Sequence, residues 1–177
     1  MNRSTNRIAI IASLAALSVA TNYALVGLPN VKAMDFLVFI GGVCFGPFAG
    51  VLIGILSWAI YGVLNPYGFV FQVWLATMLF ETIYGLVGGV VGMNLVAVNF
   101  DGKPVRMSFF YGVLGCILTL IYDSVLNVVY ALVFGVPILA ALVLGAPFQV
   151  LHAVSNSLIF ASCSIPLIRI IKRIGGG

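Results

Sequence analysis

Long apolar segments recur along the whole of this chain, and the longest polar link between them runs only from Asn94 to Arg106. Roughly 20 apolar helical residues are needed to cross a hydrocarbon core of about 30 Å. Hydrophobic residues make up 63% of the chain and charged residues only 7%, which is far more apolar than a water-soluble domain. The predicted fold class is therefore an all-α integral membrane protein of about six transmembrane helices. We expect one transmembrane domain over residues 1–177, multi-pass in the cell membrane.

Turn-forming residues divide the apolar sequence into these helices. Gly46-Pro47 splits the segment from Met34 to Leu64, because proline lacks a backbone donor and glycine permits a sharp turn. Asn65-Pro66-Tyr67-Gly68 is a further turn signature. The predicted helices are Ile8–Leu25, the two short halves of 34–64, Phe69–Met93, Met107–Phe134 and Pro147–Arg173. The apolar segment 135–146 is too short to cross, so it is predicted to be a re-entrant or interfacial lid.

The distribution of basic residues predicts the orientation. With six crossings and the N-terminus inside, seven of the eight Lys and Arg residues lie in the cytoplasm and only Lys32 lies outside. This agrees with the positive-inside rule. Both termini are therefore expected on the cytoplasmic side. The residues predicted to be inside are Arg3, Arg7, Lys103, Arg106, Arg169, Lys172 and Arg173.

Three simpler interpretations of the composition are disfavoured. Arg3 and Arg7 precede an apolar run, as in a signal peptide, but no polar globular region or small-x-small cleavage site follows it. The three cysteines form no CxxC pair, so no disulfide or metal role is predicted. The net charge of +4 arises from residues at helix ends, where anionic lipid accounts for it, and nucleic-acid binding is not expected.

Small residues form stripes in two predicted helices. Ala12, Ala16 and Ala20 recur every four residues, as do Gly46, Gly50 and Gly54. Such stripes commonly serve helix packing inside a membrane protein. The alanine stretch 12–20, Asp35 at the start of the second helix and the sequence Gly46-Pro47-Phe48-Ala49-Gly50 resemble the substrate-binding S component of energy-coupling factor (ECF) vitamin transporters. The similarity covers essentially the whole chain, although each motif is loose.

The resemblance implies partners for this chain. In that family the alanine stripe of the first helix docks onto a transmembrane T component driven by two ATP-binding subunits, which assigns partner docking to Ala12, Ala16 and Ala20. No GxxxxGK[ST] loop is present, so ATP hydrolysis is expected on a partner. The other expected partners are a small-molecule ligand and membrane lipid.

Polar residues at membrane depth are candidate ligand contacts, because they are costly to bury there. Glu81 and Asp123 lie near the middle of their helices. Asn127 follows Asp123 at i+4, and Tyr130 follows it at i+7. Gln149, His152 and Asn156 form a second stripe on the last helix. Interhelical hydrogen bonding is the alternative role, and for Gln149 or Asn127 it is at least as well supported. The predicted substrate-binding residues are Glu81, Asp123, Asn127, His152, Asn156, Trp74 and Tyr84.

Aromatic residues favour a flat ligand in the outer half of the bundle. Trp58, Tyr61, Tyr67 and Trp74 gather where the third and fourth helices meet, although an interfacial aromatic belt is the alternative for Tyr67. Trp74 and Tyr84, which are nearer to Glu81, are the candidates for stacking.

The predicted function is capture of a small vitamin or vitamin precursor for an ATP-driven importer. The acidic centre favours a thiamine-, pyrimidine- or purine-like ligand over an anionic one. One histidine without ligand partners predicts no metal site, no cofactor is expected, and Ser155 near His152 lacks the sequence context of an enzyme. The alternatives are a stand-alone proton-coupled carrier or channel that uses Glu81 and Asp123, and a purely structural assembly subunit; no convincing internal repeat supports a carrier.

Overall fold

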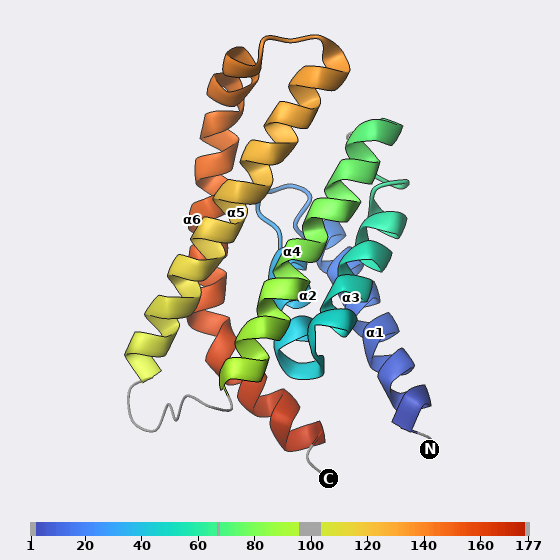
Figure 1. The fold of residues 1–177 in the computed structure, drawn as a ribbon, viewed down its shortest axis with the longest axis vertical. Coiled ribbons are helices and arrows are strands. Elements are labelled where there is room, and N and C mark those ends of the chain that lie inside the picture. The colour runs from blue at the N-terminus through green and yellow to red at the C-terminus, as the bar shows by residue number, and fades with distance from the viewer. Residues whose placement is uncertain (1–2, 67, 96–103, 176–177) are drawn as a thin grey trace.

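The described part of the chain forms six α-helices that alternate in direction, so that the first helix begins and the last helix ends at the same end of the bundle (Figure 1). This architecture comes from a computed structural model, which describes residues 3–66, 68–95 and 104–175. The helices are α1 (Arg3–Ala24), α2 (Met34–Phe45), α3 (Pro47–Tyr61), α4 (Phe71–Leu95), α5 (Pro104–Phe134) and α6 (Ile138–Gly175). The predicted all-α class and the number of helices are confirmed.

Four of these helices are long and apolar enough to cross a membrane: α1, α4, α5 and α6. Helices α2 and α3 have 12 and 15 residues, which at 1.5 Å per residue gives about 18 and 22 Å. They meet at Gly46, whose φ of 90° suits glycine, and Pro47 begins α3. The predicted break at Gly46-Pro47 and the shortness of both helices are confirmed.

The prediction of a separate segment at 135–146 is wrong. Only Gly135, Val136 and Pro137 connect α5 to α6, and residues from Ile138 onward already belong to the last helix. Pro147, which was expected to begin that helix, lies inside it. A proline removes one backbone hydrogen bond, but a neighbouring helix can hold the chain helical through it. Here α5 packs along α6 and supplies that support (Figure 1).

Helix α2 forms the centre of the bundle. Every residue from Met34 to Val43 is buried, as expected for a helix that is apolar on all sides. Its contact with α4 is so close that a Cβ built on Gly42 would lie 2.2 Å from the carbonyl oxygen of Gly85. Gly85 approaches α3 equally closely, at Gly50. Glycines therefore allow the α2, α3 and α4 backbones to touch.

The outer surface of the bundle is strongly apolar. On α5 and α6, three leucines are 70–74% exposed: Leu132, Leu139 and Leu144. Large apolar side chains are also exposed on α1, α3 and α4. Contiguous apolar surface of this extent requires an apolar surrounding. The chain is a membrane protein whose exposed face meets lipid.

Arg7 links the N-terminal end of α1 to the turn between α2 and α3. Its Nη2 donates a hydrogen bond of 3.0 Å to the carbonyl oxygen of Phe45, the last residue of α2. A cation there interacts favourably with the C-terminal end of a helix. The α2–α3 turn therefore lies at the same end of the bundle as the chain termini, as the alternating directions require (Figure 1).

Candidate functional site

Asp35 holds the centre of a buried polar cluster. It lies in the first turn of α2 and is fully buried. Its Oδ2 lies 2.7 Å from His152 Nε2, with which it shares a proton in a hydrogen bond, and accepts a 2.7 Å hydrogen bond from Asn156 Nδ2; both residues are on α6. The N-terminal end of a helix favours a negative charge, so Asp35 suits this position. Asp35 thereby joins α2 to α6.

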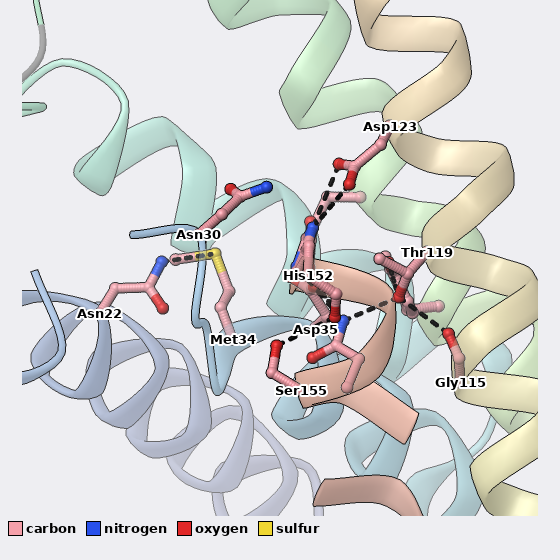
Figure 2. Close-up of polar contacts among 12 residues, drawn as sticks. Asn22, Asn30, Met34, Asp35, Gly115, Thr119, Asp123, His152 and Ser155 are labelled. Atoms are coloured by element: carbon pink, nitrogen blue, oxygen red, sulfur yellow. Dashed lines mark hydrogen bonds and ion pairs between the residues drawn. The ribbon is translucent and has the colours of Figure 1, made fainter. Parts of the chain in front are cut away.

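His152 lies between two carboxyl groups, as Figure 2 shows. Its Nε2 contacts Asp35 and its Nδ1 contacts Asp123 of α5 at 3.0 and 3.1 Å. Two such contacts need two protons, carried either by an imidazolium or by a neutral imidazole and one carboxylic acid. In both cases the three side chains together hold one net negative charge. The centre of the bundle is therefore acidic.

Thr119 on α5 completes the network. Its hydroxyl donates to the carbonyl oxygen of Gly115 at 2.8 Å (Figure 2). It accepts hydrogen bonds from Asn156 Nδ2 at 2.8 Å and from the Tyr84 hydroxyl at 3.0 Å. A hydroxyl has one donor and two acceptor positions, so all of them are used. The network therefore extends from α2 through α6 and α5 to Tyr84 of α4.

Glu81 on α4 is the second acidic element. It is fully buried, and its Oε2 accepts a 3.0 Å hydrogen bond from Trp58 Nε1 of α3. Trp58 in turn accepts a 3.0 Å bond at its carbonyl oxygen from Trp74 Nε1. Glu81 also interacts electrostatically with Asp35. Asp35 of α2 and Glu81 of α4 are therefore close enough to affect each other electrostatically.

Several buried polar atoms of this region have no partner within the described part of the chain. Most of them are hydrogen-bond acceptors. Burying each without a partner costs about 1–3 kcal/mol of free energy, unless a ligand or a water molecule supplies the missing hydrogen bond. The atoms at the centre are Asp35 Oδ1, Glu81 Oε1, Asn156 Oδ1 and the Tyr122 hydroxyl. On α1, Asn22 Oδ1 is also unpaired, and its Nδ2 reaches only the sulfur of Met34 at 3.9 Å.

Two cavities share Trp58 and Asn65 in their linings, and Trp58 connects both to the cluster through its hydrogen bond to Glu81. One of about 390 Å³ lies beneath the α1–α2 loop and is lined by Asn22, Lys32, Trp58 and Phe148 among others. The other, of about 380 Å³, is lined by Trp58, Trp74, Tyr130 and Phe134 among others. Both volumes fall in the range of small-molecule sites.

The structure brings most of the predicted site residues together. Asp123, His152, Asn156 and Tyr84 belong to the network around Asp35, and Glu81 lies close to it. Tyr84 was predicted to stack on a ligand, but its ring is fully buried against Tyr122 and its hydroxyl is used by Thr119.

The remaining predicted residues lie farther from Asp35. Trp74 lines the second cavity, and the amide of Asn127 packs against Gly145 of α6. Gln149 bonds to the Leu120 carbonyl oxygen and the Ser124 hydroxyl, which is an interhelical contact of the kind weighed from the sequence.

Sequence reasoning missed several contributors. Asp35 entered the sequence analysis only as part of the family motif. A single acidic residue at the start of an apolar helix was a sufficient signal to list it among the candidate polar contacts. Asn22 and Thr119 gave no such signal, because single small polar residues are common in membrane helices.

The alanine stripe lies on the outside of the bundle. Ala12, Ala16 and Ala20 are exposed, whereas Ile11, Ala15 and Ser18 on the same helix are buried. The stripe is therefore not used for packing inside this chain. By contrast Gly50 and Gly54 of the second stripe are buried.

The lipid-facing helices define a helical membrane protein with a buried acidic centre. Comparison with protein families agrees: residues 6–164 match the family "ECF transporter, substrate-specific component". The chain belongs to this family and is a substrate-specific membrane subunit of an ECF transporter. Neither the curated proteins nor the solved structures gave a match.

Proposed function

We propose that this subunit captures a small, nitrogen-containing vitamin or vitamin precursor from outside the cell and delivers it through an ATP-driven complex. The observation that carries the proposal is the set of buried, unpaired acceptors Asp35 Oδ1, Glu81 Oε1 and Asn156 Oδ1. Because such atoms need donors, they favour a ligand that presents several N–H groups or a positive charge. This supports a thiamine-, pyrimidine- or purine-like molecule over an anionic one.

The cavity beneath the α1–α2 loop is the proposed entrance. It opens beside Asn22 and Trp58, and Trp58 connects it to Glu81 through one hydrogen bond. A flat ring lying on Trp58 would point its polar edge at the acidic centre. In this arrangement Glu81, His152 and Asn156 contact or orient the ligand. Tyr84 does not touch the ligand but holds Thr119, which bonds to Asn156.

Mass spectrometry of the small molecule that co-purifies with the chain is the first test, followed by calorimetric titration of that molecule. Glu81→Gln keeps the shape of the side chain and removes its charge. A hydrogen bond to a charged group contributes about 1.5–3 kcal/mol, so affinity should fall roughly 10- to 100-fold. Thr82→Val on the same helix is the control, because the Thr82 hydroxyl bonds only to the Leu79 carbonyl oxygen of its own helix. Unchanged affinity in Glu81→Gln, His152→Ala and Asn156→Ala would show that these side chains serve interhelical contacts and do not bind the ligand.

The exposed alanine stripe supports docking of a T component that carries the two ATP-binding subunits. Small side chains permit close approach of another helix, and these alanines are exposed on the outside of the bundle. Ala16→Trp should abolish transport and leave ligand binding by the isolated chain intact.

Leu79→Trp is the matched control for docking, since Leu79 is 53% exposed on α4. It places the same large side chain on a face that meets lipid, so transport should continue. Equal loss of transport in both variants, or loss of ligand binding in Ala16→Trp, would contradict docking through α1. Uptake that continues without any ATP-binding subunit would instead indicate a stand-alone carrier.

A further inference from the structure

Lys32 lies beside the acidic centre, and two aromatic rings hold it. Its Nζ lies 5.8 Å from the centroid of the Trp58 ring and 5.8 Å from that of Tyr122. Both distances fall within the range of a cation–π contact. Lys32 comes from the loop between α1 and α2 and lines the 390 Å³ cavity.

The two rings are fixed by contacts that do not involve Lys32. Trp58 is oriented by its hydrogen bond to Glu81 and packs edge-on against Tyr61. Tyr122 packs against the rings of Tyr84 and His152. A pair of aromatic faces with carboxylates behind them is therefore preformed, and it is a type of site that binds organic cations.

The ammonium group is attracted to this place but has no close anionic partner. Its charge interacts with the carboxyl groups of Asp35 and Glu81. Within the described ranges 3–66, 68–95 and 104–175, however, Lys32 forms no ion pair, and the only ion pairs join His152 to Asp35 and Asp123. Cation–π contacts alone are weak, so another cation can displace this one.

We propose that the Lys32 ammonium occupies, in the ligand-free protein, the place taken by the cationic group of the ligand, so that Lys32 acts as a tethered competitor. The inference rests on the proposed function and adds the class of substrate: a flat organic cation whose charge lies between Trp58 and Tyr122 and whose body fills the cavity. A tethered group is present at a high effective concentration. Molecules that bind weakly or carry no charge are therefore excluded. Only a cation that makes additional contacts displaces the Lys32 ammonium.

The opposite role for Lys32 is direct binding of an anionic group on the ligand. The two roles are separated by three molecules of almost the same shape and different charge: benzamidinium, benzamide and benzoate. Binding of each is measured by ligand-observed NMR titration of the full chain in lipid nanodiscs. The variants are Lys32→Met, which keeps a long apolar side chain, and Lys32→Arg, which keeps a cation.

Removing a competitor held by cation–π contacts should strengthen benzamidinium binding by about 2- to 30-fold in Lys32→Met. Lys32→Arg should bind benzamidinium as the unmodified chain does, and benzamide should gain less than benzamidinium. Unchanged, weaker or undetectable benzamidinium binding in Lys32→Met overturns the proposal. Loss of benzoate binding in that variant overturns it in favour of an anion site.

The outcome is independent of the test of the proposed function. If Glu81→Gln weakens binding of the co-purified molecule while Lys32→Met leaves benzamidinium unchanged, the ligand pocket stands and only the competitor is rejected. If Lys32→Met strengthens benzamidinium while Glu81→Gln leaves the co-purified molecule unaffected, the cation site stands and the role of Glu81 in the proposed function is rejected.

Discussion

Helix α2 makes two contrasting contacts within the bundle. Towards α3 and α4 it packs through glycines, and a Cβ at Gly42 would collide with the backbone of Gly85. At its N-terminal end Asp35 reaches α5 and α6 through His152 and Asn156. The first contact leaves no space, whereas the second leaves polar atoms without partners. A close glycine contact on one side of α2 therefore accompanies, on the other side, a polar centre whose hydrogen-bonding capacity is only partly used.

The largest effect is expected from filling the glycine contact. Gly85→Ala places a methyl group 2.3 Å from the backbone of Gly50, so the helices must separate. Overpacking typically costs about 1–3 kcal/mol, and here the obstacle is backbone that has no rotamer to change. We expect aggregation or a large loss of monodisperse protein by size-exclusion chromatography in detergent.

Gly27→Ala is the matched control for this change, since nothing lies within 4 Å of a Cβ at that position. It should elute as the unmodified chain does. If Gly85→Ala behaves equally well, the close approach of α3 and α4 is wrong.

A smaller effect is expected at the polar contact of α2. Asp35→Asn keeps the shape of the side chain but removes the charge that faces His152 and Asn156. We expect binding of the co-purified molecule to weaken roughly 10- to 100-fold, because hydrogen bonds to a charged group are lost. Thermal unfolding in detergent should begin at a lower temperature, since His152 keeps fewer charged partners.

A double substitution tests whether Asp35 and His152 act as one unit. The effects of substitutions within one network are not additive. His152→Gln should therefore weaken ligand binding little further once Asp35→Asn is present. Fully additive losses in calorimetric titration would show that the two side chains act independently.

The smallest effect is expected at Gln149, which joins α6 to α5 away from Asp35. Its two hydrogen bonds are interhelical contacts, whose average contribution within membranes is about 0.6 kcal/mol each. Gln149→Ala should change ligand affinity less than about threefold and lower the unfolding temperature slightly. A loss as large as that of Asp35→Asn would extend the ligand site along α6.

The sequence singled out buried polar side chains better than it predicted their contacts. Glu81, Asp123, His152 and Asn156 were recognised because ionisable and amide groups are costly in a bilayer wherever they lie. The role of Tyr84 was missed, because its bond to Thr119 depends on how α4 and α5 face each other. The helix from Ile138 was missed for a similar reason: proline is a local signal for a helix start, and the packing of α5 against α6 overrides it.

Composition and local signals alone determined that this chain is a helical membrane protein with a break at Gly46-Pro47. Those properties follow from the hydrophobicity of each segment and from the backbone limits of glycine and proline, which do not depend on neighbours. Only the tertiary structure decided that Asp35 contacts His152 and Asn156 of α6, that the alanine stripe faces outward, and that Lys32 lies between Trp58 and Tyr122. These are contacts between residues far apart in the chain, and they are set by which faces of the helices pack together.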